Sequence, residues 1–201
     1  MTHLELYMGG SVDTCSSLRL ASRGVACFNN RVTELRLPQL QVSDRRTDRL
    51  SDLKFLTKLS LRSNSFNGTI PSALSQCKLL RAVSLQYNSL SGTLPSGISN
   101  LTDLDILNLA QNHLSGEISR DHPRNIKYLD LSWNSSSGSV PTSIANLSQH
   151  QLINLSYNRF SGEIPASFSE LQQLQYLWLD YNVLEGTLPS ALANSSSHNS
   201  F

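Results

Sequence analysis

Leucines recur along the chain in a short alternating pattern that ends at an asparagine. Leu59 and Leu61 precede one such asparagine, and Leu107 and Leu109 precede another. Polar residues separate the leucines, so the pattern has the two-residue period of a strand that buries one face. The sequence therefore predicts a short, half-buried strand before each of the ladder asparagines, which are Asn64, Asn88, Asn112, Asn134, Asn158 and Asn182.

The ladder asparagines follow one another at intervals of 24, 24, 22, 24 and 24 residues. Such a period is the signature of a solenoid, in which stacked coils bury an apolar face that no single coil can bury alone. We expect about eight parallel strands in a concave sheet, with each asparagine turned inward to satisfy backbone groups. A glycine four residues after each asparagine, usually followed by proline, predicts a tight turn and then a convex segment.

The segment after each asparagine is more specific than a generic leucine repeat. The stretches SNSFNGTIPSAL, YNSLSGTLPSGI and YNRFSGEIPASF resemble the plant-type leucine-rich repeats of receptor-like serine/threonine kinase ectodomains and of secreted polygalacturonase inhibitors. The resemblance implies an α/β solenoid: an arc with a parallel concave sheet and a convex side of irregular, 3-10 or short helical turns, twisted by a second set of short strands. It also implies binding of a ligand or co-receptor outside the cell.

Three regions are expected: a degenerate amino-terminal cap over residues 1–30, a solenoid of one degenerate and about six regular repeats over 31–194, and a tail over 195–201. The cap of the resembling family reads CxWxGVxC. Here LASRGVAC keeps only the second half of that motif, with Cys27 at the second cysteine and Leu20 at the first. The sequence leaves open whether Cys15 pairs with Cys27 instead.

Three irregularities interrupt the repeats. Cys77 stands where other repeats have leucine, so it is expected to be a small core residue. His150 stands where a leucine begins the strand motif, and we expect it to be a tolerated substitution at the surface edge. The coil between Asn112 and Asn134 is two residues shorter than the others, which predicts a shorter convex path.

The charge balance argues against several classes of partner. The net charge is +1, from 16 Lys and Arg against 15 Asp and Glu, so neither nucleic acid nor a membrane surface is indicated. No stretch approaches the ~20 apolar residues of a membrane span. Residues 31–62 hold eight of the bases, whereas residues 160–201 hold four acids and no Lys or Arg. An arc with ends of opposite charge would orient a charged ligand, although a solvated surface without a partner is the plainer interpretation.

Catalytic chemistry is not indicated either. The histidines and cysteines lack the spacing of a metal site, and the sequence contains no P-loop, GxGxxG run, GxSxG elbow or kinase signature. We therefore expect no cofactor, no metal and no enzymatic activity, and we look for function on the surface of the arc.

Aromatic residues concentrate at positions that should face outward from the concave sheet or its rim. Exposed aromatics with scattered polar groups are typical of recognition surfaces. Tyr87, Trp133, Tyr157 and Tyr181 directly precede ladder asparagines, where the rings can equally well cover the sheet edge. Trp178 lies between two buried leucines and should project from the face. The candidate ligand-binding residues are Tyr128, Asp130, Trp133, Tyr176, Trp178, Asp180 and Tyr181.

The compartment is indicated by two opposing observations. N-glycosylation patterns occur at Asn67, Asn100, Asn146, Asn154 and Asn194, and also at ladder residue Asn134, which should be buried and unmodified. Asn100 and Asn146 are the better candidates. The first residues lack a basic start and a continuous apolar core, so as written the chain should not enter the secretory pathway. The resemblance implies the extracellular face of the plasma membrane or secretion; a chain complete as written would be intracellular.

Three functional hypotheses follow. The first is a recognition module of a receptor-like kinase ectodomain, whose partner is a peptide, a small hormone or another leucine-rich repeat receptor. The second is a secreted inhibitor resembling polygalacturonase inhibitors. The third is a truncated product that is non-functional or acts as a decoy.

Overall fold

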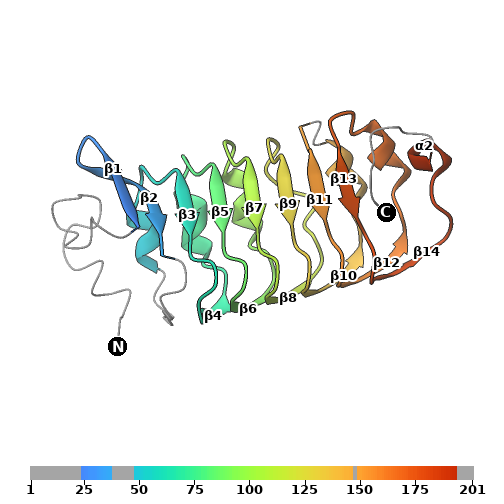
Figure 1. The fold of residues 1–201 in the computed structure, drawn as a ribbon, viewed down its shortest axis with the longest axis horizontal. Coiled ribbons are helices and arrows are strands. Elements are labelled where there is room, and N and C mark those ends of the chain that lie inside the picture. The colour runs from blue at the N-terminus through green and yellow to red at the C-terminus, as the bar shows by residue number, and fades with distance from the viewer. Residues whose placement is uncertain (1–23, 38–47, 147–148, 194–201) are drawn as a thin grey trace.

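The computed structural model describes residues 24–37, 48–146 and 149–193. The coils follow one another along the long axis of the molecule, from β1 at the blue end to α2 at the red end (Figure 1). One sheet crosses all the coils, and a second line of strands runs along one edge of it (Figure 1). The expected solenoid is thereby confirmed.

The concave sheet has eight strands in the order β1-β2-β3-β5-β7-β9-β11-β13. Neighbours from β2 to β13 pair in parallel, whereas β1 is antiparallel to β2. Our expectation of about eight parallel strands was therefore wrong by one, because a tight turn at Asn29 and Asn30, both with positive φ, folds β1 back along β2. The strands are Val25–Phe28 (β1), Arg31–Arg36 (β2), Lys58–Ser60 (β3), Ala82–Ser84 (β5), Ile106–Asn108 (β7), Tyr128–Asp130 (β9), Leu152–Asn154 (β11) and Tyr176–Trp178 (β13).

The second sheet forms where the glycine segment leaves each coil. Its six parallel strands are Asn67–Thr69 (β4), Ser89–Gly92 (β6), His113–Gly116 (β8), Ser135–Ser139 (β10), Arg159–Glu163 (β12) and Val183–Glu185 (β14). Gly138 shows why glycine is required there. Its φ is +78°, and an added Cβ would lie 2.5 Å from the Cγ of Glu117 in the neighbouring coil.

Single helical turns form the convex side. They are 3-10 turns at Asp48–Asp52 (η2), Ser72–Gln76 (η3), Ser96–Asn100 (η4), Thr142–Asn146 (η5) and Ala166–Glu170 (η6), with a short helix at Ser190–Ala193 (α2). Pro71, Pro95 and Pro165 directly precede three of the turns. Residues 117–127 contain no such turn, so the coil that is two residues shorter does take the simpler convex path.

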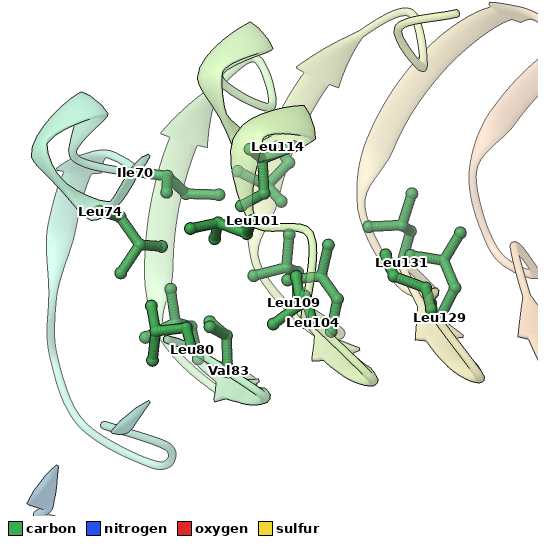
Figure 2. Close-up of a cluster of buried hydrophobic side chains, with 14 of the residues drawn as sticks. Ile70, Leu74, Leu80, Val83, Leu101, Leu104, Leu109, Leu114, Leu129 and Leu131 are labelled. Atoms are coloured by element: carbon green, nitrogen blue, oxygen red, sulfur yellow. The ribbon is translucent and has the colours of Figure 1, made fainter. Parts of the chain in front are cut away.

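Apolar side chains from the strands and the convex turns fill the space between them (Figure 2). Cys77 is fully buried in this core, and its Sγ donates to the carbonyl of Leu50 at 3.0 Å, which confirms its expected role. Burial raises the pKa of the Cys77 thiol to about 11.

His150 is fully buried, so its expected place at the surface edge was wrong. It occupies a column of residues whose exposure is 1% or less and whose other members are Leu56, Leu80, Leu104, Ile126 and Leu174. Neither imidazole nitrogen has a hydrogen-bond partner. Burial first, and the nearby His122 second, lower the pKa of His150 to about 4.

The ladder asparagines connect successive coils. The Asn112 amide nitrogen donates to three backbone carbonyls, those of Leu85 in the preceding coil and of Leu109 and Ala110 in its own. Its Oδ1 accepts a hydrogen bond from the backbone N–H of Leu90 at 2.9 Å. Asn88, Asn134, Asn158 and Asn182 repeat both halves of this arrangement, and the Asn64 amide makes the same three donations. The inward orientation of the ladder is thus confirmed.

Candidate ligand-binding face

Strand register aligns the outward side chains of the concave sheet in two rows. The first row is Glu34, Lys58, Ala82, Ile106, Tyr128, Leu152 and Tyr176. The middle row is Arg36, Ser60, Ser84, Asn108, Asp130, Asn154 and Trp178. Both rows begin with charged residues and end with aromatic ones, so the two ends of the face differ chemically.

The aromatic end contains four of the candidate residues on the sheet itself. Tyr128 and Tyr176 are exposed in the first row, and Trp178 is half-buried in the middle row. The rings of Tyr176 and Trp178 are nearly parallel, with centroids 5.6 Å apart, and the Tyr128 hydroxyl donates to Gln151 Oε1 at 2.7 Å. These contacts hold the aromatic rings in place on a surface that is partly exposed to solvent.

Two carboxylates accompany these rings. Asp130 Oδ1 accepts hydrogen bonds from the backbone N–H and the hydroxyl of Ser132, at 3.0 and 2.7 Å. This contact orients Asp130 and leaves its second oxygen available. Asp180 is exposed two residues beyond β13. An aromatic surface with oriented carboxylates suits cationic or amide-bearing groups.

Trp133 and Tyr181 lie outside both rows. With Tyr157 they form the aromatic edge stack, in which ring centroids are 3.8 Å apart for Trp133–Tyr157 and 4.1 Å apart for Tyr157–Tyr181. All three residues have positive φ, between 52° and 54°. A hydrogen bond with the Tyr181 side chain is the main cause that raises the pKa of Tyr157. Because the rings stack face to face, the aromatic edge stack presents mainly ring edges to solvent. This geometry agrees with the interpretation that the rings cover the edge of the sheet.

The opposite end of the face is a shallow basic hollow of about 270 Å³, lined by Arg36, Lys58, Leu59, Ser60, Arg62, Ala82 and Ser84. Glu34 pairs with Arg36 at 2.6 Å and with Lys58 at 3.0 Å. The Lys58 hydrogen bond is the main reason that the pKa of Glu34 is lowered. The sequence shows the excess of bases near the amino end but does not reveal this hollow. The hollow also depends on the small residues Ala82 and Ser84 of β5, the strand next to β3.

Family comparison agrees with the repeats. The model of the leucine-rich repeat family matches residues 55–77, 79–101, 125–147, 151–171 and 173–195, which together are more than half of the chain. The chain belongs to the leucine-rich repeat family. The matched ranges omit 102–124, most of which is the coil with the short convex path.

Several plant proteins are similar to this chain. The Arabidopsis thaliana protein STRUBBELIG is 35% identical over 72 residues, which are 36% of this chain and 9% of that protein. The plant peptide hormone receptor RGFR1, solved in complex with RGF2, is 35% identical with a TM-score of 0.80, over 84% of this chain and 27% of that one. The Arabidopsis receptor kinase HAESA, solved with the peptide hormone IDA and the co-receptor SERK1, is 27% identical with a TM-score of 0.78. The match covers 89% of this chain and 35% of that one. The chain thus spans about a third or less of these relatives.

The remaining predicted sites are distributed over the leucine-rich repeat surface. Asn67 on β4 and Asn100 at the end of η4 are exposed, and Asn154 is half-buried in the middle row. Asn146 ends η5, and Asn194 lies outside the described residues. Ladder residue Asn134 is half-buried rather than buried, but its amide nitrogen is occupied by three carbonyls. Modification at all these positions stays a prediction.

The remaining predictions concern the cysteines, membrane spans and metal sites. Cys27 is not a free thiol, and Cys15 lies outside the described residues, so their pairing stays a prediction. Among the described residues, no helix has the length and apolarity needed to cross a bilayer. Nor do three or more potential metal ligands gather anywhere in the described part of the chain.

Proposed function

We propose that this leucine-rich repeat chain is a non-catalytic recognition module of a receptor ectodomain, and that its concave face binds an extended peptide outside the cell. The observation that carries the proposal is the aromatic end of the face. The exposed Tyr128 and Tyr176 and the half-buried Trp178 lie on one continuous sheet surface, with Asp130 and Asp180 beside them. Rings of this kind commonly dominate binding energy at protein interfaces.

The dimensions of the sheet support an extended ligand. Seven parallel strands at about 4.8 Å spacing give a face about 29 Å long, which about eight to nine extended residues would cross. The related receptors provide support by analogy, since RGFR1 was solved with RGF2, and HAESA with the peptide hormone IDA and a co-receptor.

Selection from a random peptide library tests the proposal without knowledge of the natural ligand. The purified chain would be used to enrich peptides of about ten residues, and the affinities of the enriched peptides would be measured by calorimetry. We expect Trp178→Ala and Tyr176→Ala each to weaken binding about 30-fold, which corresponds to about 2 kcal/mol for a central aromatic contact.

Tyr87→Ala is the matched control, because Tyr87 is an exposed tyrosine that lies outside both rows. It should leave affinity unchanged, and circular dichroism should show that all three variants remain folded. Failure to enrich any peptide, or equal binding by the Tyr176, Trp178 and Tyr87 variants, would refute binding on the concave face.

A further inference from the structure

The two ends of the concave face carry opposite charges. On the strands β2 to β13 and the three residues that follow each of β3 to β13, the amino-terminal end has one acid, Glu34, and four bases, Arg31, Arg36, Lys58 and Arg62. The strands β5 and β7 and their following residues carry no charge. From β9 onward the only charged residues are Asp130 and Asp180. This separation is independent of the aromatic residues on which the proposed function rests.

The basic hollow has the features of a carboxylate site. Its three bases outnumber the single acid that pairs with two of them, and Arg62 makes no ion pair within the described part of the chain. The next two strands place Ser60, Ala82 and Ser84 in the floor of the hollow, so small side chains leave room beside the guanidinium. An arginine with free N–H groups binds a carboxylate in a bidentate manner, and serine hydroxyls add further donors.

The aromatic end is complementary to a cation. Trp178 follows Asn154 and Asp130 along the middle row, and Asp180 is exposed two residues beyond Trp178 on the same coil. A lysine or arginine lying over the indole would gain a cation–π contact and a carboxylate partner at once. No Lys or Arg of the face from β9 to β13 competes for these acids.

We propose that the peptide bound by this face has separated charges and lies in one direction, with a carboxylate in the basic hollow and a lysine or arginine over Trp178 and Asp180. This inference deepens the proposed function and rests on it. Arg62 and Asp180 follow β3 and β13, which are five strand steps apart, or about 24 Å at 4.8 Å a step. The two ligand charges are therefore separated by about seven extended residues.

Charge reversal with matched controls tests the proposal. The peptides enriched on the unaltered chain should contain an acid and a base about seven residues apart. Arg62→Glu and Asp180→Lys should each weaken their binding at least tenfold at low salt, with the loss shrinking as salt rises. The controls are Arg159→Glu on β12 and Glu170→Lys on η6, which make the same charge changes away from the face and should leave affinity unchanged.

Cross-linking tests the direction. A photoreactive group beside the peptide's acid should label Arg36 and residues 58–84 of the unaltered chain. In the double variant Arg62→Glu with Asp180→Lys, it should label residues 128–181 instead. Amidation of the peptide's carboxyl end identifies the source of the carboxylate: lost binding assigns it to the terminus, and retained binding assigns it to an Asp or Glu side chain.

The outcomes separate this inference from the function on which it rests. If no peptide is enriched, both proposals fail. If peptides are enriched and need Trp178, yet show no charge separation and bind Arg62→Glu as well as Arg159→Glu, the directional inference fails and the concave binding site stands. Labelling spread evenly over the coils would also overturn the inference.

Discussion

Stability of the chain in mild acid should depend on His150. This imidazole is fully buried in a column of leucine and isoleucine residues, and both of its nitrogens lack hydrogen-bond partners. The other group that lowers the pKa of His150 is His122, a half-buried residue whose own pKa is lowered chiefly by burial and whose Nε2 lies 3.3 Å from the Ser143 hydroxyl. Protonation of His150 would therefore place an uncompensated charge in the core.

The size of the effect follows from the two pKa values of His150, about 4 in the folded chain and 6.5 as its ordinary value. Between these values the unfolded chain binds more protons, so folding is favoured fully above about pH 6.5 and stability is lost as pH falls toward 4. The difference amounts to about 2 kcal/mol at pH 5 and about 3 kcal/mol at pH 4. His150→Leu should remove this loss and add about 1 kcal/mol at neutral pH, because it removes two unsatisfied polar atoms.

Urea unfolding followed by circular dichroism, at intervals from pH 8 to pH 5, would measure the effect. Carboxylates such as Glu34 also lose stabilising contacts in acid, so the informative quantity is the difference between the unaltered chain and His150→Leu. That difference should grow by about 2 kcal/mol over this range. His113→Gln, at an exposed position on β8, should leave the acid loss in place. A difference that stayed constant with pH would refute the reasoning.

Three further predictions concern other parts of the chain. Asn112→Ala should lower the free energy of unfolding by about 2 kcal/mol in urea, because it removes the acceptor of the Leu90 N–H and one of two donors from each of three backbone carbonyls, whereas Asn108→Ala should cost less than about 1 kcal/mol; equal losses would contradict the ladder's role. Cys77 should resist iodoacetamide at pH 8 until the chain unfolds, as mass spectrometry of trypsin fragments would show, because burial keeps the thiol protonated. In chain expressed through a plant secretory pathway, glycopeptide mapping should find Asn100 modified and Asn154 unmodified; a glycan on Asn154 would occupy the proposed binding face.

Much of the fold could be predicted from the sequence because every coil repeats the same local requirement. An asparagine that links two coils, a positive-φ glycine and an alternating leucine pair each have one structural use, and six repetitions remove the ambiguity of a single copy. The antiparallel β1 and the burial of His150 were harder to predict. The turn before β2 occurs once and has no repeating partner, and a histidine in a leucine column looks the same in sequence whether the column is a core or an edge.

The candidate site was predictable only in part. Alternation placed Trp178 and Asp130 on the concave face, because a residue between two buried leucines must point outward. It could not distinguish the face from the edge for Trp133 and Tyr181, since the residue before each ladder asparagine adopts positive φ and leaves the strand direction. The basic hollow was missed because it depends on the absence of bulk at Ser84 and Ala82, which becomes visible only when adjacent strands are in register.

The division between repeated and variable positions explains how this fold can carry specific recognition. In the six regular coils the asparagine and glycine columns do not vary and the leucine columns that precede the asparagine stay apolar except at His150, because these residues contact the neighbouring coils and a change there alters stability. The outward rows interact mainly with solvent, so their members differ from coil to coil without cost to the fold, from Arg36 at one end of the middle row to Trp178 at the other. Substitutions in these rows should therefore change what is bound while the unfolding free energy stays nearly constant, and that separation is what the Trp178 and Tyr176 variants measure.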